Sequence, residues 1–177
     1  MVRAGVLIVG IIPIIFAILI AVPMITQPEI PIGAVVPEDK ITIEYTTHEL
    51  KVISFGVTER TGSLFTEILT VKDDGEVKYS TVVEGYPQPE KKSKIGEEKL
   101  KKLTAIIKET GFMEIPSDTY PVKEGIEEYK KSTIKVTLNG KTKQIHWLEQ
   151  NATENFIPPI ITMIELELNQ IIKQLNQ

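Results

Sequence analysis

The chain has two histidines, His48 and His146, and no cysteine. A zinc site needs three or four nitrogen, sulfur or carboxylate ligands, so two histidines far apart in the sequence are a poor start. His48 stands beside Glu49, where we expect the edge of the domain. His146 lies in a predicted strand, on the face opposite Ile145 and Trp147. We therefore expect no metal and no cofactor, and the lack of cysteine excludes disulfides and thiol catalysis.

Other catalytic motifs are missing as well. The sequence contains no Gly-x-Ser-x-Gly elbow and no glycine-rich phosphate loop. Asp73-Asp74-Gly75-Glu76 lacks the alternating carboxylates of a calcium loop and is typical of a turn. Glu124, Glu127 and Glu128 form an acidic cluster that we interpret as a solvated face, with a docking surface for a basic partner as the alternative. An enzyme needs converging titratable groups, so we predict binding rather than catalysis.

Residues 84–94 are the best candidate for a binding segment. They join a predicted strand to a predicted helix and combine a tyrosine, two prolines and three lysines. A proline-rich loop that carries an aromatic ring loses little entropy on binding, and tyrosine is enriched where interfaces carry their energy. A solvated linker is the alternative. The predicted binding residues are Tyr86, Pro87, Pro89, Lys91, Lys92 and Lys94.

One sequence motif concerns modification. Asn151-Ala152-Thr153 matches the acceptor pattern for N-glycosylation and precedes the predicted last helix. Chance alone supplies such a match about half the time in a chain of this composition, so the motif carries little weight.

The N-terminal segment predicts attachment to a membrane. Ala4–Ile25 contains no charged residue, and as a helix it would span about 33 Å, enough for a hydrocarbon core of roughly 30 Å. Arg3 is the only charge before it, which favours a cytoplasmic N-terminus and a domain outside the cell. A cleaved signal peptide is the first alternative, although no small-x-small cleavage site follows the apolar run. A buried core helix is the second.

The segment that follows predicts a tether. Residues 26–40 contain Pro28, Pro31, Pro37 and Gly33, a density of proline that favours extended chain. A disordered spacer and a stalk lying along a partner subunit are the two interpretations. Residues 41–177 are then long enough for one domain with its own core. From residue 26 onward the chain carries 24 acidic and 19 basic residues, so we expect no nucleic-acid partner.

Period-two alternation predicts the strands of that domain. We expect a strand around Ile41–Tyr45 and a meander over Lys51–Glu59, Leu64–Lys72 and Val77–Val83, with turns at Arg60–Ser63 and Asp73–Gly75. Ser132–Leu138 and Lys141–Leu148 form a predicted hairpin, because Asn139-Gly140 is the preferred pair for a type I′ turn.

Two helices complete the predicted domain. Glu97–Thr110 carries an apolar stripe between Gly96 as N-cap and Gly111 as the left-handed residue after the helix. Pro158 and Pro159 open a second amphipathic helix. The order of elements predicts an α+β fold: a transmembrane helix, then a two-layer sandwich of a five- or six-stranded, mainly antiparallel sheet with two helices on one face.

Several of these pieces occur together in known proteins. Phe65–Ile68, Asp74-Gly75, Val77-Lys78-Tyr79, Gly96–Leu103, Gly111-Phe112 and Asn139-Gly140-Lys141 resemble a family of uncharacterised secreted or membrane-anchored α+β domains from bacteria and archaea. The resemblance covers residues 51–175 and implies a fold and a location, but no activity. Members of that family often carry a cysteine pair near the second strand, and this chain has none.

Three classes of function follow. The first is a membrane-anchored extracytoplasmic interaction domain with a protein partner at the membrane, as in an accessory subunit of a larger complex. The excess of lysine over arginine and the many isoleucines resemble proteins from AT-rich archaeal genomes, and archaeal ammonia monooxygenase is the complex that this similarity suggests. The second class is a module that binds the cell envelope or a small ligand. An enzyme of unknown class is the third.

Overall fold

The computed structural model describes residues 33, 35–56, 58–117 and 119–176. The predicted anchor Ala4–Ile25 and most of the predicted tether lie outside these residues. Within the described part of the chain, no helix combines the length and the apolar character needed to cross a membrane.

Seven strands form one antiparallel sheet, which confirms the α+β class and exceeds the five or six strands expected. The order across the sheet is β4-β3-β2-β1-β6-β7, and β5 pairs with β3 beside β4. The strands are β1 (Ile41–Phe55), β2 (Thr58–Val71), β3 (Glu76–Val83), β4 (Tyr86–Pro87), β5 (Lys91–Lys94), β6 (Glu128–Leu138) and β7 (Lys141–Leu148).

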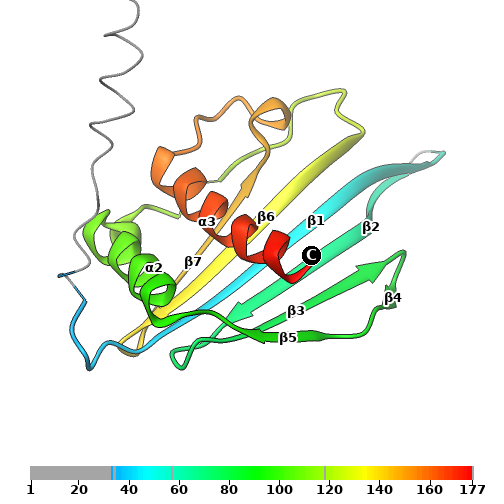
Figure 1. Cartoon of the computed structure of the whole chain (residues 1–177). Coiled ribbons are helices and arrows are strands. Elements are labelled where there is room, and N and C mark those ends of the chain that lie inside the picture. The colour runs from blue at the N-terminus through cyan, green and yellow to red at the C-terminus, as the bar shows by residue number, and fades with distance from the viewer. Residues whose placement is uncertain (1–32, 34, 57, 118, 177) are drawn as a thin grey trace, which may run out of the picture. The chain divides into compact units, whose positions relative to one another are not determined.

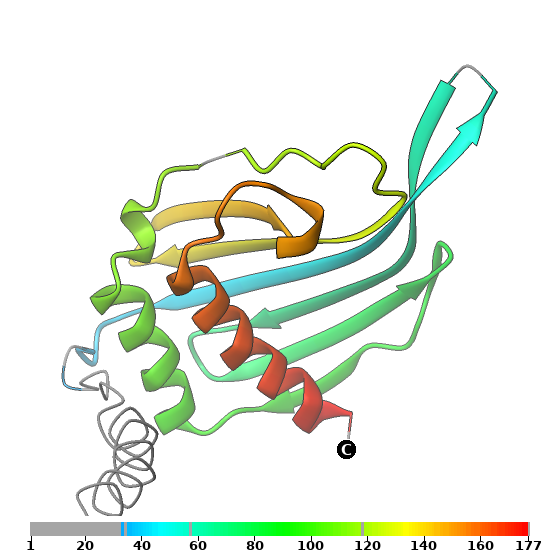
Figure 2. The same cartoon turned by 90° about the horizontal axis from the view of Figure 1, so that it is seen from above.

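Two helices, α2 (Glu97–Glu109) and α3 (Pro159–Leu175), cover the same face of the sheet (Figures 1 and 2). Two short 3₁₀ helices, η2 (Phe112–Glu114) and η3 (Gln150–Ala152), lie in the connections. The core forms between these layers because alternate strand residues and one stripe of each helix are apolar. Its most buried members include Ile43, Val71, Val136, Leu103 and Ile164, each with no exposed surface.

Local sequence signals placed several boundaries correctly. Gly96 is the N-cap of α2, and Gly111 follows the helix with a φ of 70°, as a left-handed ending requires. Asn139 and Gly140 have φ values of 50° and 81°, the conformation of the expected type I′ turn between β6 and β7. Pro159 begins α3 at its first position.

The first hairpin differs from its prediction. The two expected strands Ile41–Tyr45 and Lys51–Glu59 belong largely to one continuous strand, and the predicted turn Arg60–Ser63 is part of β2. Gly56, with a φ of 71°, lies in the connection between β1 and β2 instead. Cross-strand pairing continues through Arg60, which opposes Ile53, because a run of polar residues does not prevent a ladder whose side chains face water.

A bulge divides this hairpin into two parts. Glu49 pairs with Phe65 while Leu50 pairs with Ser63, so Leu64 is the extra residue. A bulge bends and twists its strand. Beyond it, the hairpin projects past the other strands (Figure 2). The sequence had suggested that His48 lies at the edge of the domain, but His48 lies within the long central strand β1.

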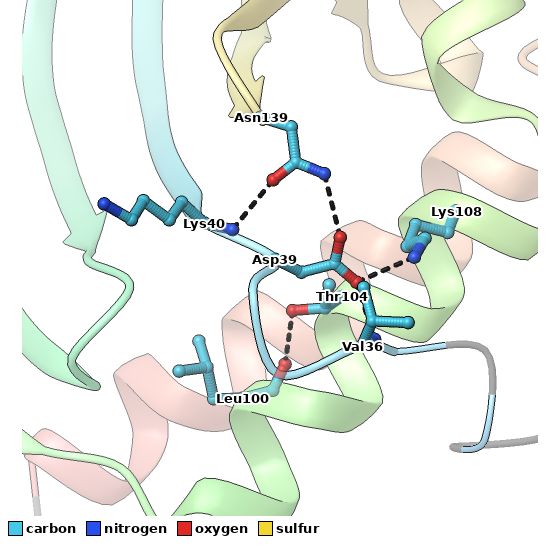
Figure 3. A network of polar contacts seen from close by, with 7 residues as sticks. All are labelled: Val36, Asp39, Lys40, Leu100, Thr104, Lys108 and Asn139. Carbon is cyan, nitrogen blue, oxygen red and sulfur yellow. Dashed lines mark hydrogen bonds and ion pairs between the residues drawn. The ribbon is translucent and has the colours of Figure 1, made fainter.

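The end of the predicted tether is held by the domain. The side chain of Asp39 is only 2% exposed and accepts hydrogen bonds from Val36 N, Lys108 Nζ and Asn139 Nδ2. Asn139 Oδ1 also accepts from the backbone of Lys40 (Figure 3). Burial raises the pKa of the Asp39 carboxyl, but these bonds outweigh it and hold the pKa below its usual value. The chain entering β1 is therefore fixed to α2 and to the β6–β7 turn.

Candidate binding surface

The face of the sheet that the helices leave uncovered is polar and mainly basic. We call it the open face, and it consists of the strand side chains that alternate with the buried ones. It carries five lysines and two glutamates, together with a row of threonines. The charged members are Lys78, Lys92, Lys94, Lys131, Lys135, Glu44 and Glu76, and the threonines are Thr42, Thr46, Thr66, Thr70, Thr133, Thr137 and Thr142.

Ion pairs neutralise part of the positive charge of the open face. Lys135 contacts Glu44 at 3.0 Å, and Lys78 lies 3.9 Å from Glu76. No ion pair is recorded for Lys94 or Lys131 among the described residues. The open face therefore keeps positive charge in a chain whose formal net charge is −4.

The structure brings the two histidines to this same face. His48 on β1 opposes Lys131 on β6, and His146 on β7 opposes Thr133, two residues further along β6. Sequence reasoning missed this arrangement, because the order of the strands decides it. Burial, and then the charge of Lys131, lower the pKa of both imidazoles. Both rings are accordingly neutral at pH 7.

Each histidine is fixed by hydroxyl partners. Nδ1 of His48 lies 2.8 Å from Oγ1 of Thr66, and Nδ1 of His146 lies 2.8 Å from Oγ1 of Thr133. The Gln144 amide donates to Nε2 of His146, so Nδ1 of that ring carries the proton. Across the described residues, no three His, Cys, Asp or Glu side chains are grouped in a way that could hold a metal ion. The two histidines are therefore a polar part of the open face.

The predicted binding segment forms the edge of the sheet beside β3. It is not a loop throughout, because Tyr86-Pro87 and Lys91–Lys94 pair with β3 as β4 and β5. Tyr86 is 74% exposed, and Pro87 and Pro89 are exposed too. The segment thus presents one large aromatic ring on a strand that the sheet already holds in place.

The three predicted lysines of this edge have different surroundings. Lys91 points to the helix side and donates to Oδ1 of Asn176 at 2.8 Å. Lys92 contacts Glu90 at 3.4 Å, and Lys94 opposes Glu76 across the strand pair. Edge lysines also hinder edge-to-edge pairing between copies of a sheet, so part of their role is protection against aggregation.

The remaining sequence candidates lie elsewhere. Asn151 is exposed in η3, and Lys123 donates to its backbone oxygen. Asp74 closes its turn by accepting from the Glu76 backbone, which supports the turn interpretation. Glu124 and Glu127 line an open cleft beside the projecting hairpin, where Glu128 is paired with Lys51. None of these residues extends the open face into a larger site.

No protein-family model matches the chain, and no match was found among curated proteins either. The surface must therefore be interpreted from its own chemistry.

Proposed function

We propose that the chain is a membrane-anchored interaction domain that docks a protein partner of acidic surface through the open face and the adjoining edge strands β4 and β5. The observation that carries the proposal is the asymmetry of the sheet. The helices bury most of one face, while the other presents lysine, histidine and threonine side chains, and the exposed ring of Tyr86 stands at the edge of the sheet, where it opposes Val83.

Charge and shape both support such a partner. A basic face on a chain of net negative charge attracts an acidic surface and repels a second copy of the same face. Tyr86 provides a large amphipathic anchor at the rim, and a backbone already paired as a strand costs little further entropy to immobilise. Nucleic acid fits less well, because stacking needs rows of rings and the described open face has one tyrosine, Tyr129, near the projecting hairpin.

The location rests on the sequence of the N-terminal segment. An anchor at Ala4–Ile25 would hold the domain close to the membrane, since the roughly ten residues before Val36 would reach about 30 Å as extended chain. The high effective concentration of a tethered domain lets a surface of modest affinity form a stable complex. We therefore propose a single-pass protein with a cytoplasmic N-terminus, acting as an accessory subunit of a membrane complex.

Two matched aromatic substitutions test the docking surface. Tyr86 and Phe156 are exposed to the same degree, 74% and 73%, but Phe156 lies in the connection before α3, outside the open face. The full-length chain is purified from its own membranes in mild detergent, and the subunits that co-purify are quantified for each variant. We expect Tyr86→Ala to lower recovery of the partner by about tenfold, and Phe156→Ala to leave it unchanged.

A charge reversal extends this test. Lys131→Glu should weaken the complex and reduce its salt dependence, whereas Lys99→Glu on α2 should do neither. Equal recovery of the partner by wild type, Tyr86→Ala and Lys131→Glu would contradict the proposed docking surface. Topology is checked separately with protease added to intact cells, which should remove the domain.

A further inference from the structure

A small cavity between α3 and the end of the sheet holds a carboxylate that forms no ion pair within the described part of the chain. The cavity measures about 220 Å³, and its wall includes Trp147, Leu148, Ile157 and Glu165. Such a volume is smaller than the sites that take drug-sized ligands. It lies on the helix side of the sheet and shares none of the residues proposed above for docking.

Two buried hydroxyls orient the Glu165 carboxylate. Oε1 accepts from the hydroxyl of Tyr45 at 3.0 Å and from Oγ of Ser132 at 3.4 Å. Tyr45 and Ser132 are only 1% and 3% exposed. Burial, together with the charge of Glu165, raises the pKa of Tyr45 far above its usual value, so its hydroxyl remains a donor. The carboxylate is therefore fixed in position at the cavity.

The charge around this carboxylate is incompletely balanced. No ion pair is recorded for Glu165 among the described residues. Glu149 and Lys130 also line the cavity, and one oxygen of Glu149 accepts from the backbone of Lys130. The lining thus includes two acidic residues and one lysine. A partly buried negative charge is costly unless a positive charge accompanies it, so the cavity favours a cation.

The remaining wall is apolar and aromatic. Trp147 stacks on Tyr45 with 6.3 Å between ring centroids, and Leu148 and Ile157 are buried beside the cavity. Carbon atoms of a ligand would be covered by these side chains, and an aromatic ring attracts a cation placed near its face. An inorganic ion would gain nothing from such a wall, and hard cations need about six oxygen ligands.

Next to Ser132 of the cavity wall is one further buried hydroxyl, that of Thr47, which does not itself line the cavity. Thr47 pairs with Ser132 across β1 and β6 and is 2% exposed. Among the described residues, its hydroxyl is the one buried side-chain polar atom with no partner in good hydrogen-bond geometry, although it is close enough to the Tyr45 hydroxyl to act on the pKa of that group. Buried polar atoms almost always have partners, and each exception calls for an explanation such as strain, a functional role or a bound water or ion. Tyr45, Thr47 and Ser132 are thus three buried hydroxyl-bearing residues on adjacent strands, and two of them donate to Glu165.

We propose that this cavity binds a small organic ammonium ion, with the charged nitrogen at Glu165 and the carbon chain against Trp147 and Ile157. The site is separate from the docking surface and does not depend on the proposed membrane complex.

Trp147 provides the measurement, because it is the only tryptophan of the chain. The full-length protein in detergent micelles is titrated with butylammonium, with the neutral isostere butanol and with butyrate, at constant ionic strength in potassium chloride. We expect a saturable change in tryptophan emission with butylammonium, binding at least tenfold weaker for butanol, and no saturation with butyrate. Equal affinities for butylammonium and butanol would overturn the proposal, and so would a saturable response to potassium alone.

Substitutions separate the carboxylate from the rest of the wall. Glu165→Gln keeps an oxygen that can accept from Tyr45, so it should fold normally and lose the preference for butylammonium over butanol. Glu154→Gln, an exposed control outside the cavity, should keep that preference. Lys130→Met should tighten butylammonium binding, because it removes a competing positive charge. A weaker response in Lys130→Met, or full selectivity in Glu165→Gln with an unchanged melting temperature, would contradict a cation site.

Discussion

The two faces of the sheet are made by the same strands and have opposite chemistry. On β1, Ile43 and Tyr45 point toward the helices and are fully buried, while Thr42, Glu44 and Thr46 point away from them. The covered face gains stability from apolar area removed from water. The open face gains little from burial, so its residue types are free to serve another purpose. This difference indicates that the fold depends on the covered face, and it is the reason that we place the proposed docking on the open one.

The largest expected difference between the two faces appears when neighbouring residues on opposite faces are truncated. Ile43→Ala should lower the free energy of unfolding by about 2–5 kcal/mol, since it leaves a cavity in the core. Thr42→Ala, one position earlier, should cost less than about 1 kcal/mol. Urea denaturation followed by circular dichroism measures both. Similar losses for the two variants would mean that the open face is also part of a packed core.

Asp39 tests how firmly the entering chain is fixed to the covered side. Asp39→Ala removes three hydrogen bonds and leaves Lys108, whose side chain is 24% exposed, without this partner. We expect a loss of about 2–3 kcal/mol in the free energy of unfolding. Exposed Glu38→Ala, one residue earlier, serves as the control and should be near neutral.

Acid should reproduce part of the Asp39→Ala effect. The folded pKa of Asp39 lies below its unfolded value, so its contribution is complete above about pH 4. It is lost as the pH falls through the lowered folded pKa. Denaturation curves of wild type and Asp39→Asn, measured between pH 5 and pH 2.5, should therefore converge toward the acid end. Parallel curves over that range would show that the carboxylate does not titrate with folding.

The smallest expected effect is a shift in the titration of the two histidines of the open face. Lys131→Met removes one cause of their lowered pKa values and leaves burial in place, so both pKa values should rise. Because these values are lowered in the folded state, stability falls as the pH drops below about 6.5, and Lys131→Met should reduce that loss.

Imidazole proton resonances followed by NMR give both pKa values directly. Lys143→Met on β7 is the control, since Lys143 donates to Ser117 away from the histidines. A rise in pKa for one histidine alone would mean that Lys131 acts on that ring only. No rise for either would mean that Lys131 does not affect the titration of the two histidines.

Much of the fold could be predicted because its signals are local. The ends of α2, the start of α3 and the β6–β7 turn depend on glycine, proline and asparagine at positions where their backbone preferences are specific. The first hairpin could not be placed in this way. Arg60–Ser63 has the composition of a turn, yet pairing with β1 along its full length keeps it in a strand, and only the bulge at Leu64 interrupts the register.

The candidate sites differ in the same way, because some could be predicted from local sequence and others depend on the order of the strands. Tyr86 and its neighbouring prolines could be singled out from composition, and the structure adds that they form an edge of the sheet. The open face could not be predicted, because it needs the strand order that places His48, Lys131 and His146 on adjacent strands. Glu165 looks in the sequence like one more charged residue on an amphipathic helix.

The sequence by itself determined the class of fold, the two helices, the late hairpin and the residues that must be buried, since each follows from the periodicity and backbone preferences of neighbouring residues. Tertiary structure alone decided which strands lie side by side, and thus where the lysines gather and which carboxylate meets Tyr45 and Ser132. The physical reason is that pairing between distant strands depends on the summed burial of a whole face, a quantity that no short window of sequence contains.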